Sequence, residues 1–145
     1  MPRILGIDLG LKRTGLAISD ETGLTARALP VHKPKSRDED VAFVLDLIKK
    51  HDVDTVVIGY ALLPRSQDEG FMAKRARGFA LVLGDAAGRQ GVPLKVHLVE
   101  EAFTSEDANA RLIEQGMSPR DRRLAIDGEV ARMLVIDFAH TRGKV

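Results

Sequence analysis

Apolar residues follow two patterns along the chain: short, nearly unbroken runs, and stripes that repeat every three or four residues. Short runs bounded by Gly, Pro or polar residues are typical of β-strands, and runs without alternation are typical of strands buried on both faces. Such runs cover residues 3–9, 15–19, 24–32, 54–59 and 94–99. The first two are separated by a short turn with Gly at its start, which predicts a β-hairpin.

The stripes predict four amphipathic helices, over residues 38–51, about 66–89, from Thr104 onward, and 126–140. Thr104 is expected to cap the third helix, since a threonine hydroxyl accepts a hydrogen bond from the first turn. A polar break with Gly116 and Pro119 separates the third helix from the last. The side chains expected to face the core are Val41, Val44, Leu45, Ile48, Met72, Ala76, Phe79, Ala80, Leu83, Ala108, Leu112, Ile113, Ala131, Leu134 and Phe138.

The predicted elements follow the order β-β-β-α-β-α-β-α-α. Strands joined by short turns must be antiparallel, whereas strands joined through a helix are normally parallel, with a right-handed crossover. This order predicts an α/β fold with a mixed five-stranded sheet, three strands antiparallel and then two parallel, and helices on both faces. The first strand is expected at the centre, between its hairpin partner and strand 54–59, within one domain that spans residues 1–145.

Composition limits the chemistry more than it defines it. The chain has no cysteine, which excludes disulfides, thiolate catalysis and cysteine-ligated metals. A net charge of +1 indicates neither a strongly basic nucleic-acid binder nor an acidic protein. The apolar runs are far shorter than the ~20 residues of a membrane span, and no signal peptide is evident, so a cytoplasmic protein without membrane contact is expected.

Acidic residues interrupt the apolar pattern at three places. They are Asp8 in the first strand, Glu100 and Glu101 at the end of the last strand, and Asp127 where the inward face of the last helix begins. Taken singly, each has a structural explanation, because an acid at a strand end or in the first turn of a helix is commonly a cap or a partner of the helix dipole. Taken together, they lie where the ends of neighbouring parallel strands and a covering helix can meet.

Acids that converge without a counterion repel one another, whereas divalent cations hold them together in the ionised form. An all-oxygen site fits Mg²⁺ or Mn²⁺, here two ions, with positions left for phosphate and water. Asp8 would bridge both ions, and Glu101 and Asp127 would each complete one coordination sphere. Strand alternation lets only one of Glu100 and Glu101 face such a site, and the pattern alone does not choose between them.

Several cations are candidates for contacts with nucleic-acid phosphates. Lys12 and Arg13 lie in the turn after the first strand, although an exposed turn also favours charge for solubility. A second group follows strand 54–59 and continues along the next helix, where the alternative is a solvated helix face; its members are Arg65, Lys74, Arg75 and Arg77. Gly10 and Gly15 are expected to serve the backbone geometry of the hairpin turn.

The stretch GIDLGLKRTGLAISD, residues 6–20, resembles the D-x-G-x-K-x-x-G-x-A-x-S/G signature of the YqgF/RuvX family. VVIGYALLPRSQDEG, VEEAFTSEDA and IDGEVARMLVIDFA stand where the family has a strand and loop, an acidic pair and the last helix. The family belongs to the RNase H-like superfamily, and its members are described as Holliday junction resolvases or pre-16S rRNA processing nucleases. The resemblance covers essentially the whole chain in the right order, and it implies an RNase H-like fold and a hydrolase acting on phosphodiester bonds.

The resemblance also implies which acids act. Matched by position, Asp8, Glu101 and Asp127 form the catalytic and metal-binding triad, and Glu100 takes the place of the family's Asp. The chain departs from the family pattern twice: Ala102 stands where an Arg normally follows the acidic pair, and residues 61–64 (ALLP) replace a Pro-Leu-Asn-type loop. Both departures concern substrate contacts and leave the acids intact.

The leading hypothesis is therefore a metal-dependent endonuclease for structured nucleic acid. Branched DNA is the first candidate substrate, and the 5′ end of precursor 16S rRNA is the alternative. Cleavage of a four-way junction would call for a homodimer, because a two-fold junction needs two symmetric incisions. Two other classes are a non-catalytic adaptor that keeps the fold, and an actin-like nucleotide-binding protein, which needs a second domain that 145 residues do not supply.

Overall fold

The computed structural model describes residues 3–60, 69–100 and 105–142. These residues form five strands and four helices with their connections. The strands are β1 (Arg3–Asp8), β2 (Thr14–Ser19), β3 (Ala26–His32), β4 (Val53–Tyr60) and β5 (Lys95–Glu100). The helices are α1 (Arg37–Lys50), α2 (Glu69–Arg89), α3 (Ser105–Glu114) and α4 (Pro119–Arg142). The predicted order of elements is confirmed, while Thr104 and the predicted start of the second helix lie outside the described residues.

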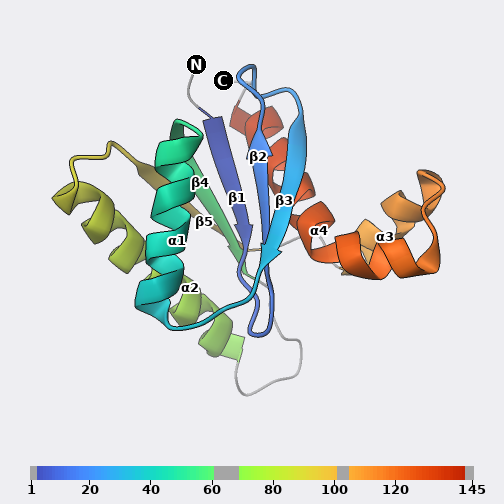
Figure 1. Cartoon of the computed structure of the whole chain (residues 1–145), viewed down its shortest axis with the longest axis horizontal. Coiled ribbons are helices and arrows are strands. Elements are labelled where there is room, and N and C mark those ends of the chain that lie inside the picture. The colour runs from blue at the N-terminus through green and yellow to red at the C-terminus, as the bar shows by residue number, and fades with distance from the viewer. Residues whose placement is uncertain (1–2, 61–68, 101–104, 143–145) are drawn as a thin grey trace.

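The strands form one mixed sheet in the order β3-β2-β1-β4-β5 (Figure 1). β1 pairs with β2 in the antiparallel sense, and β2 pairs with β3 in the same way. β4 pairs with β1 and with β5 in the parallel sense. The predicted sheet, with the first strand at its centre, is confirmed.

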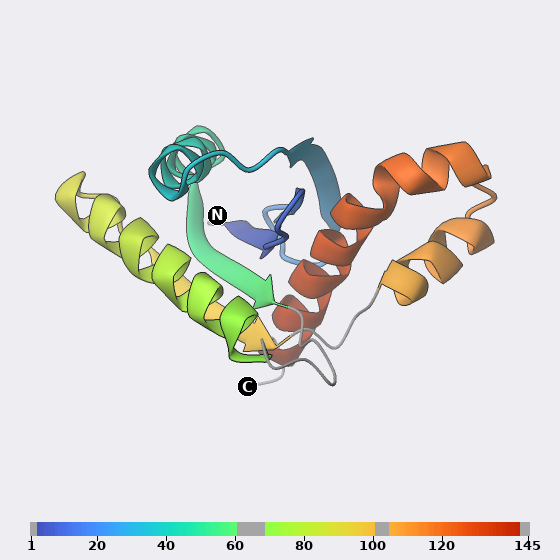
Figure 2. The same cartoon turned by 90° about the horizontal axis from the view of Figure 1, so that it is seen from below.

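The helices cover the two faces of the sheet unequally (Figure 2). Leu5 and Ile7 of β1 point into the main core, which α1 and α2 close from one side. Gly6, between them, faces α4 on the other side, where a side chain at this position would lie 2.9 Å from the Ala131 carbonyl oxygen. α3 packs against α4 and so lies outside it in a further layer.

The inward stripes of the helices largely agree with the sequence pattern, although Ala80 and Phe138 are only partly buried. The α1 stripe is buried at Val41, Val44, Leu45 and Ile48, and the α2 stripe at Met72, Ala76, Phe79 and Leu83. In α3, Ala108 and Leu112 are buried, but the expectation for Ile113 is wrong, since its side chain is 51% exposed. In the described parts of the chain α3 packs mainly against α4, so a single narrow stripe is enough to hold it.

The last helix begins at Pro119, well before the predicted start at residue 126. Pro at the first helical position costs no hydrogen bond and already has a helical φ angle. Ser118 caps this end, because its hydroxyl oxygen accepts a hydrogen bond from the Asp121 N–H at 3.2 Å. The sequence break at Gly116 and Pro119 is therefore only the short connection between α3 and α4. None of the described helices combines the length and the apolarity that a membrane crossing requires.

Candidate active site

Asp8 is the last residue of β1, at the end of the central strand. It pairs with Gly15 of β2 on one side and with Gly59 of β4 on the other, and neither of these partners has a side chain. Its side chain alternates with those of Leu5 and Ile7, and therefore lies on the α4 face of the sheet. The carboxylate is thus placed at one end of the sheet, beside the helix that carries Asp127.

Because Gly15 has no side chain, α4 can pack close to the strand position beside Asp8. A side chain at Gly15 would overlap the Asp127 carbonyl oxygen, and its Cβ would lie 2.7 Å from the carbonyl carbon and 3.3 Å from the Asp127 Cβ. The backbone of α4 at Asp127 therefore rests directly on the strand residue that pairs with Asp8. The expected role of Gly15 in turn geometry is wrong, because Gly15 is a strand residue whose small size admits the helix.

Asp127 lies more than two turns inside α4, since the helix starts at Pro119. The structural explanation for an acid in a first turn, as a cap or a dipole partner, does not apply at this depth. Its carboxylate is mostly buried, with 19% of the side chain exposed, and forms an ion pair with Arg13, whose Nε lies 2.9 Å from Oδ2. Asp127 is thus an acid on an apolar helix face with a cation as its partner.

Arg13 comes from the turn between β1 and β2, and 66% of its side chain is exposed. Lys12 lies beside it in the same turn and is also exposed. The turn is compact, because a side chain on Gly10 would overlap the Arg13 carbonyl oxygen. The structure thus brings Arg13 together with a predicted catalytic acid.

β5 ends next to β4, with Glu100 paired to Tyr60. Val96 packs into the core beneath α1 and α2, and the His97 ring contacts that of Phe138 in α4 at 5.0 Å. Side chains alternate between the two faces along β5, so Glu100 lies on the face opposite α4, where it is exposed. Glu101 and Ala102 lie outside the described residues.

The cations predicted along α2 lie on a different face of the molecule. α2 packs against the sheet on the side opposite α4 (Figure 2), so Lys74, Arg75 and Arg77 do not share the face of Asp127. Lys74 and Arg77 are exposed, whereas Arg75 is half-buried. Its Nη1 atom is buried without a hydrogen-bond partner in the described parts of the chain. Arg65 and the 61–64 segment lie outside those parts.

The donor set at Asp8 and Asp127 fits a hard divalent cation. Both are carboxylates, the ligand type that Mg²⁺ and Mn²⁺ prefer, and they come from two rigid elements held together at Gly15. Within residues 3–60, 69–100 and 105–142 no cluster of three His, Cys, Asp or Glu residues could hold a metal. A complete site would therefore need a ligand from outside these ranges.

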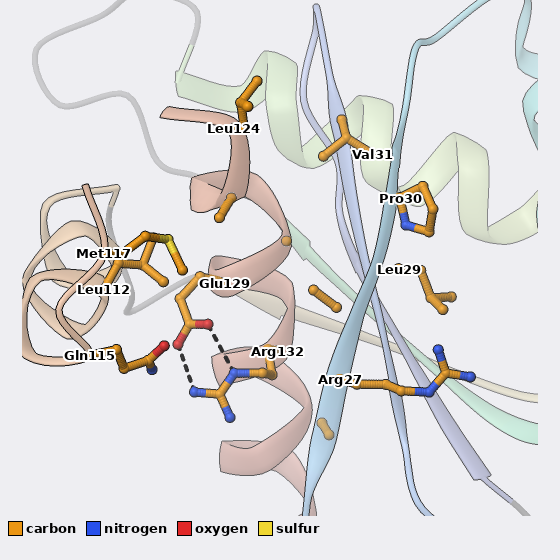
Figure 3. A pocket seen from close by; sticks show the side chains of 14 residues that line it. Arg27, Leu29, Pro30, Val31, Leu112, Gln115, Met117, Leu124, Glu129 and Arg132 are labelled. Carbon is orange, nitrogen blue, oxygen red and sulfur yellow. Dashed lines mark hydrogen bonds and ion pairs between the residues drawn. The ribbon is translucent and has the colours of Figure 1, made fainter. Parts of the chain in front are cut away.

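A groove of about 530 Å³ lies between the edge strand β3 and helices α3 and α4, and the sequence pattern gave no sign of it (Figure 3). Its wall includes Leu112, Met117 and Leu124, and an ion pair in which Arg132 holds Glu129 through two hydrogen bonds of 2.9 and 2.7 Å. Because Glu129 accepts these hydrogen bonds from the guanidinium, the pKa of Arg132 is raised above its ordinary value. No acid or cation predicted for the active site lines this groove among the described residues.

The fold has clear counterparts among solved structures. T. thermophilus RuvC in complex with a Holliday junction substrate is similar to the whole chain, with a TM-score of 0.59 and 20% identity over 98% of the RuvC chain. The Fowlpox virus resolvase in complex with Holliday junction DNA has a TM-score of 0.55 and 14% identity, covering 97% of this chain and 98% of its own. The sheet order, with acids at the end of β1 and inside α4, defines an α/β protein with an RNase H-like fold.

Sequence comparison narrows this class to one family. Residues 2–139 match the model of the RuvX family, described as Holliday junction resolvase. The chain belongs to this family. A relative from Anaeromyxobacter sp. (strain Fw109-5), called "Putative pre-16S rRNA nuclease", is 39% identical over 92% of this chain and 93% of its own length. A relative from Clostridium acetobutylicum with the same name is 31% identical over 96% of this chain and 98% of its own.

Proposed function

We propose that this chain is a divalent-metal-dependent endonuclease that hydrolyses phosphodiester bonds in structured nucleic acid. The observation that carries the proposal is the packing of the Asp127 backbone on Gly15, the strand partner of Asp8. This contact holds two acids from the two ends of the chain at one end of the sheet. Membership in the RuvX family supports the same activity.

Asp8, Asp127 and Glu101 are the proposed ligands of two Mg²⁺ or Mn²⁺ ions. Two such ions about 4 Å apart, when bound, stabilise the attacking water and the leaving oxygen of an in-line displacement. The alternation of β5 supports Glu101 over Glu100, because Glu100 falls on the face opposite α4. The chain's own contribution is the placement of Asp8 at the end of β1 and of Asp127 inside α4.

The exposed cations of the β1–β2 turn, Lys12 and Arg13, are the proposed phosphate contacts nearest the acids. Lys74, Arg75 and Arg77 would meet a nucleic acid only where it passes around the sheet to the α2 side. Arg65, which follows β4 in the sequence, is proposed with them as a phosphate contact. An extended substrate, such as a branched duplex, could reach both faces.

The leading substrate is four-way branched DNA, on which we expect the protein to act as a homodimer in the cytoplasm. The fold shared with RuvC and with the Fowlpox virus resolvase favours this choice. The second candidate is precursor 16S rRNA, which the relatives at 31 and 39% identity favour by their names.

Cleavage assays with a synthetic four-way junction and with precursor 16S rRNA test the proposal, each with Mg²⁺, with Mn²⁺ and with a chelator. We expect metal-dependent cleavage of one of the two, and a loss of at least about a hundredfold in Asp8→Asn and Asp127→Asn, comparable to losing one catalytic group. Asp46→Asn, an exposed acid on α1, is the matched control and should cut normally. Cleavage of neither polymer in any metal, or normal cleavage by Asp8→Asn, would reject the nuclease and favour an adaptor.

A further inference from the structure

We propose that Arg13 is a displaceable counterion: it neutralises Asp127 until a metal ion binds and then turns to the substrate phosphate. The inference rests on the proposed function, in which Asp127 is a metal ligand. It concerns the order of events at that site, and it gives Arg13 a second partner besides the substrate.

The two partners of the ion pair differ in how firmly they are held. Asp127 belongs to the interior of α4, is mostly buried, and has its backbone pinned against Gly15. Arg13 extends from a turn with 66% of its side chain in solvent. Such an exposed guanidinium gives up little burial when it leaves, whereas the carboxylate stays in place.

A divalent cation on Asp127 would repel the guanidinium that now occupies the same carboxylate. Arg13 Nε lies 2.9 Å from Oδ2, the distance of direct contact, so a metal ion on that carboxylate would meet the positive guanidinium at close range. Because a partly exposed ion pair is weak, the doubly charged ion prevails. Without metal, Arg13 offsets the charge of Asp127, one of the three proposed acids, and a bound cation takes over that role.

The freed guanidinium remains beside the site. Its turn is fixed by the close approach of Gly10 to the Arg13 carbonyl group, and by the hydrogen bond from Leu9 N–H to the Gly59 carbonyl oxygen at 3.2 Å. Movement is therefore confined to the side chain. A guanidinium offers paired N–H donors that match the oxygens of a phosphodiester.

A purely structural role for Arg13 predicts the opposite change in metal affinity when Arg13 is removed. If Arg13 only held the Asp127 side chain in its rotamer, removing it would loosen the carboxylate and weaken metal binding. A displaceable counterion competes with the metal, so removing it strengthens metal binding. The same substitution then weakens substrate binding, since the phosphate loses its partner.

Calorimetric titration of Mn²⁺ into the full chain tests this, with Arg13→Gln and the matched control Lys12→Gln. We expect Arg13→Gln to bind Mn²⁺ about two- to fivefold more tightly, the range set by a weak ion pair, and Lys12→Gln to change affinity by less. With saturating Mn²⁺, Arg13→Gln should raise the KM for nucleic acid about three- to tenfold, and Arg13→Lys should recover part of it. The Nε–Hε resonance of Arg13 should shift on Mg²⁺ addition in NMR spectra.

Asp127→Asn separates failure of this inference from failure of the proposed function. If Asp127→Asn abolishes Mn²⁺ binding while Arg13→Gln leaves it unchanged or weaker, the counterion role is rejected and the nuclease stands. An Arg13 resonance that does not shift on Mg²⁺ addition also rejects the counterion role and leaves the proposed nuclease in place. If the unmodified chain binds no Mn²⁺, the metal site and the counterion role fail together.

Discussion

At Gly15 the absence of one side chain sets the distance between the sheet and α4. The strand residue touches the Asp127 backbone, and its pairing with Asp8 brings the two acids to the same place. A residue without charge or hydrogen-bonding side chain thereby controls the geometry of a charged site.

Gly15→Ala is expected to destabilise the protein by about 1 to 3 kcal/mol, the usual cost of forcing a methyl group into a packed interface. It should also weaken Mn²⁺ binding, because α4 must shift at Asp127. Denaturant unfolding and calorimetric titration measure the two effects.

The control is Gly84→Ala in α2, where a Cβ would meet nothing within 4 Å. Alanine favours the helix over glycine, so this variant should be as stable as the parent or more so. Equal stability of the two variants would show that the Gly15 contact carries no strain.

At this scale the apolar pattern was enough to select Asp8 and Asp127, since a charge stands out against buried neighbours. It could not assign Gly15, whose requirement arises only when a helix from the far end of the chain meets the strand. The pairing of Arg13 with Asp127 was hidden for the same reason. Contacts between distant segments leave no periodic signal in either segment.

At the scale of elements, α4 is the helix on which the site depends. The predicted start of this helix is later than the observed start at Pro119 because a proline near a glycine resembles a helix break, although proline is favoured at the first position of a helix. The sheet order, by contrast, follows from hairpin and crossover rules, and the sequence was sufficient to predict it.

Within α4, Arg132→Met should destabilise the protein by about 2 to 3 kcal/mol, because it leaves the buried Glu129 carboxylate without its partner. The double variant Glu129→Leu with Arg132→Met should recover much of this loss, since no buried charge remains. Thermal and denaturant unfolding of both variants measure the difference. A double variant no more stable than Arg132→Met alone would contradict the explanation.

His51, which ends α1, should make stability depend on pH. Burial, followed by the charges of Arg27, Lys50 and Arg3, lowers the pKa of His51 from 6.5. The unfolded chain therefore takes up a proton first as the pH falls through 6.5, and this favours unfolding until the folded protein is protonated too. His51→Gln should lose less stability than the parent between about pH 7.5 and 5.5 in denaturant titrations. An identical slope in both proteins would contradict the assignment.

At the scale of the whole molecule, metal binding should stabilise the fold, because the proposed ligands Asp8 and Asp127 come from β1 and α4, at opposite ends of the chain. Mn²⁺ at a hundred times its dissociation constant should add about 2.7 kcal/mol to the free energy of unfolding. Thermal unfolding with and without Mn²⁺ measures this as a rise in Tm. Asp8→Asn should show no such rise, and an equal rise in that variant would place the metal elsewhere.

Because Asp8 lies in the first strand and Asp127 in the last helix, the order of synthesis matters. A growing chain on the ribosome displays the central strand long before α4 exists, and contacts between such distant segments form late in folding. The two acids therefore meet only once nearly the whole chain has been made. If these acids cut RNA or DNA as proposed, the nascent chain has no complete site while it is still beside the RNA of the ribosome.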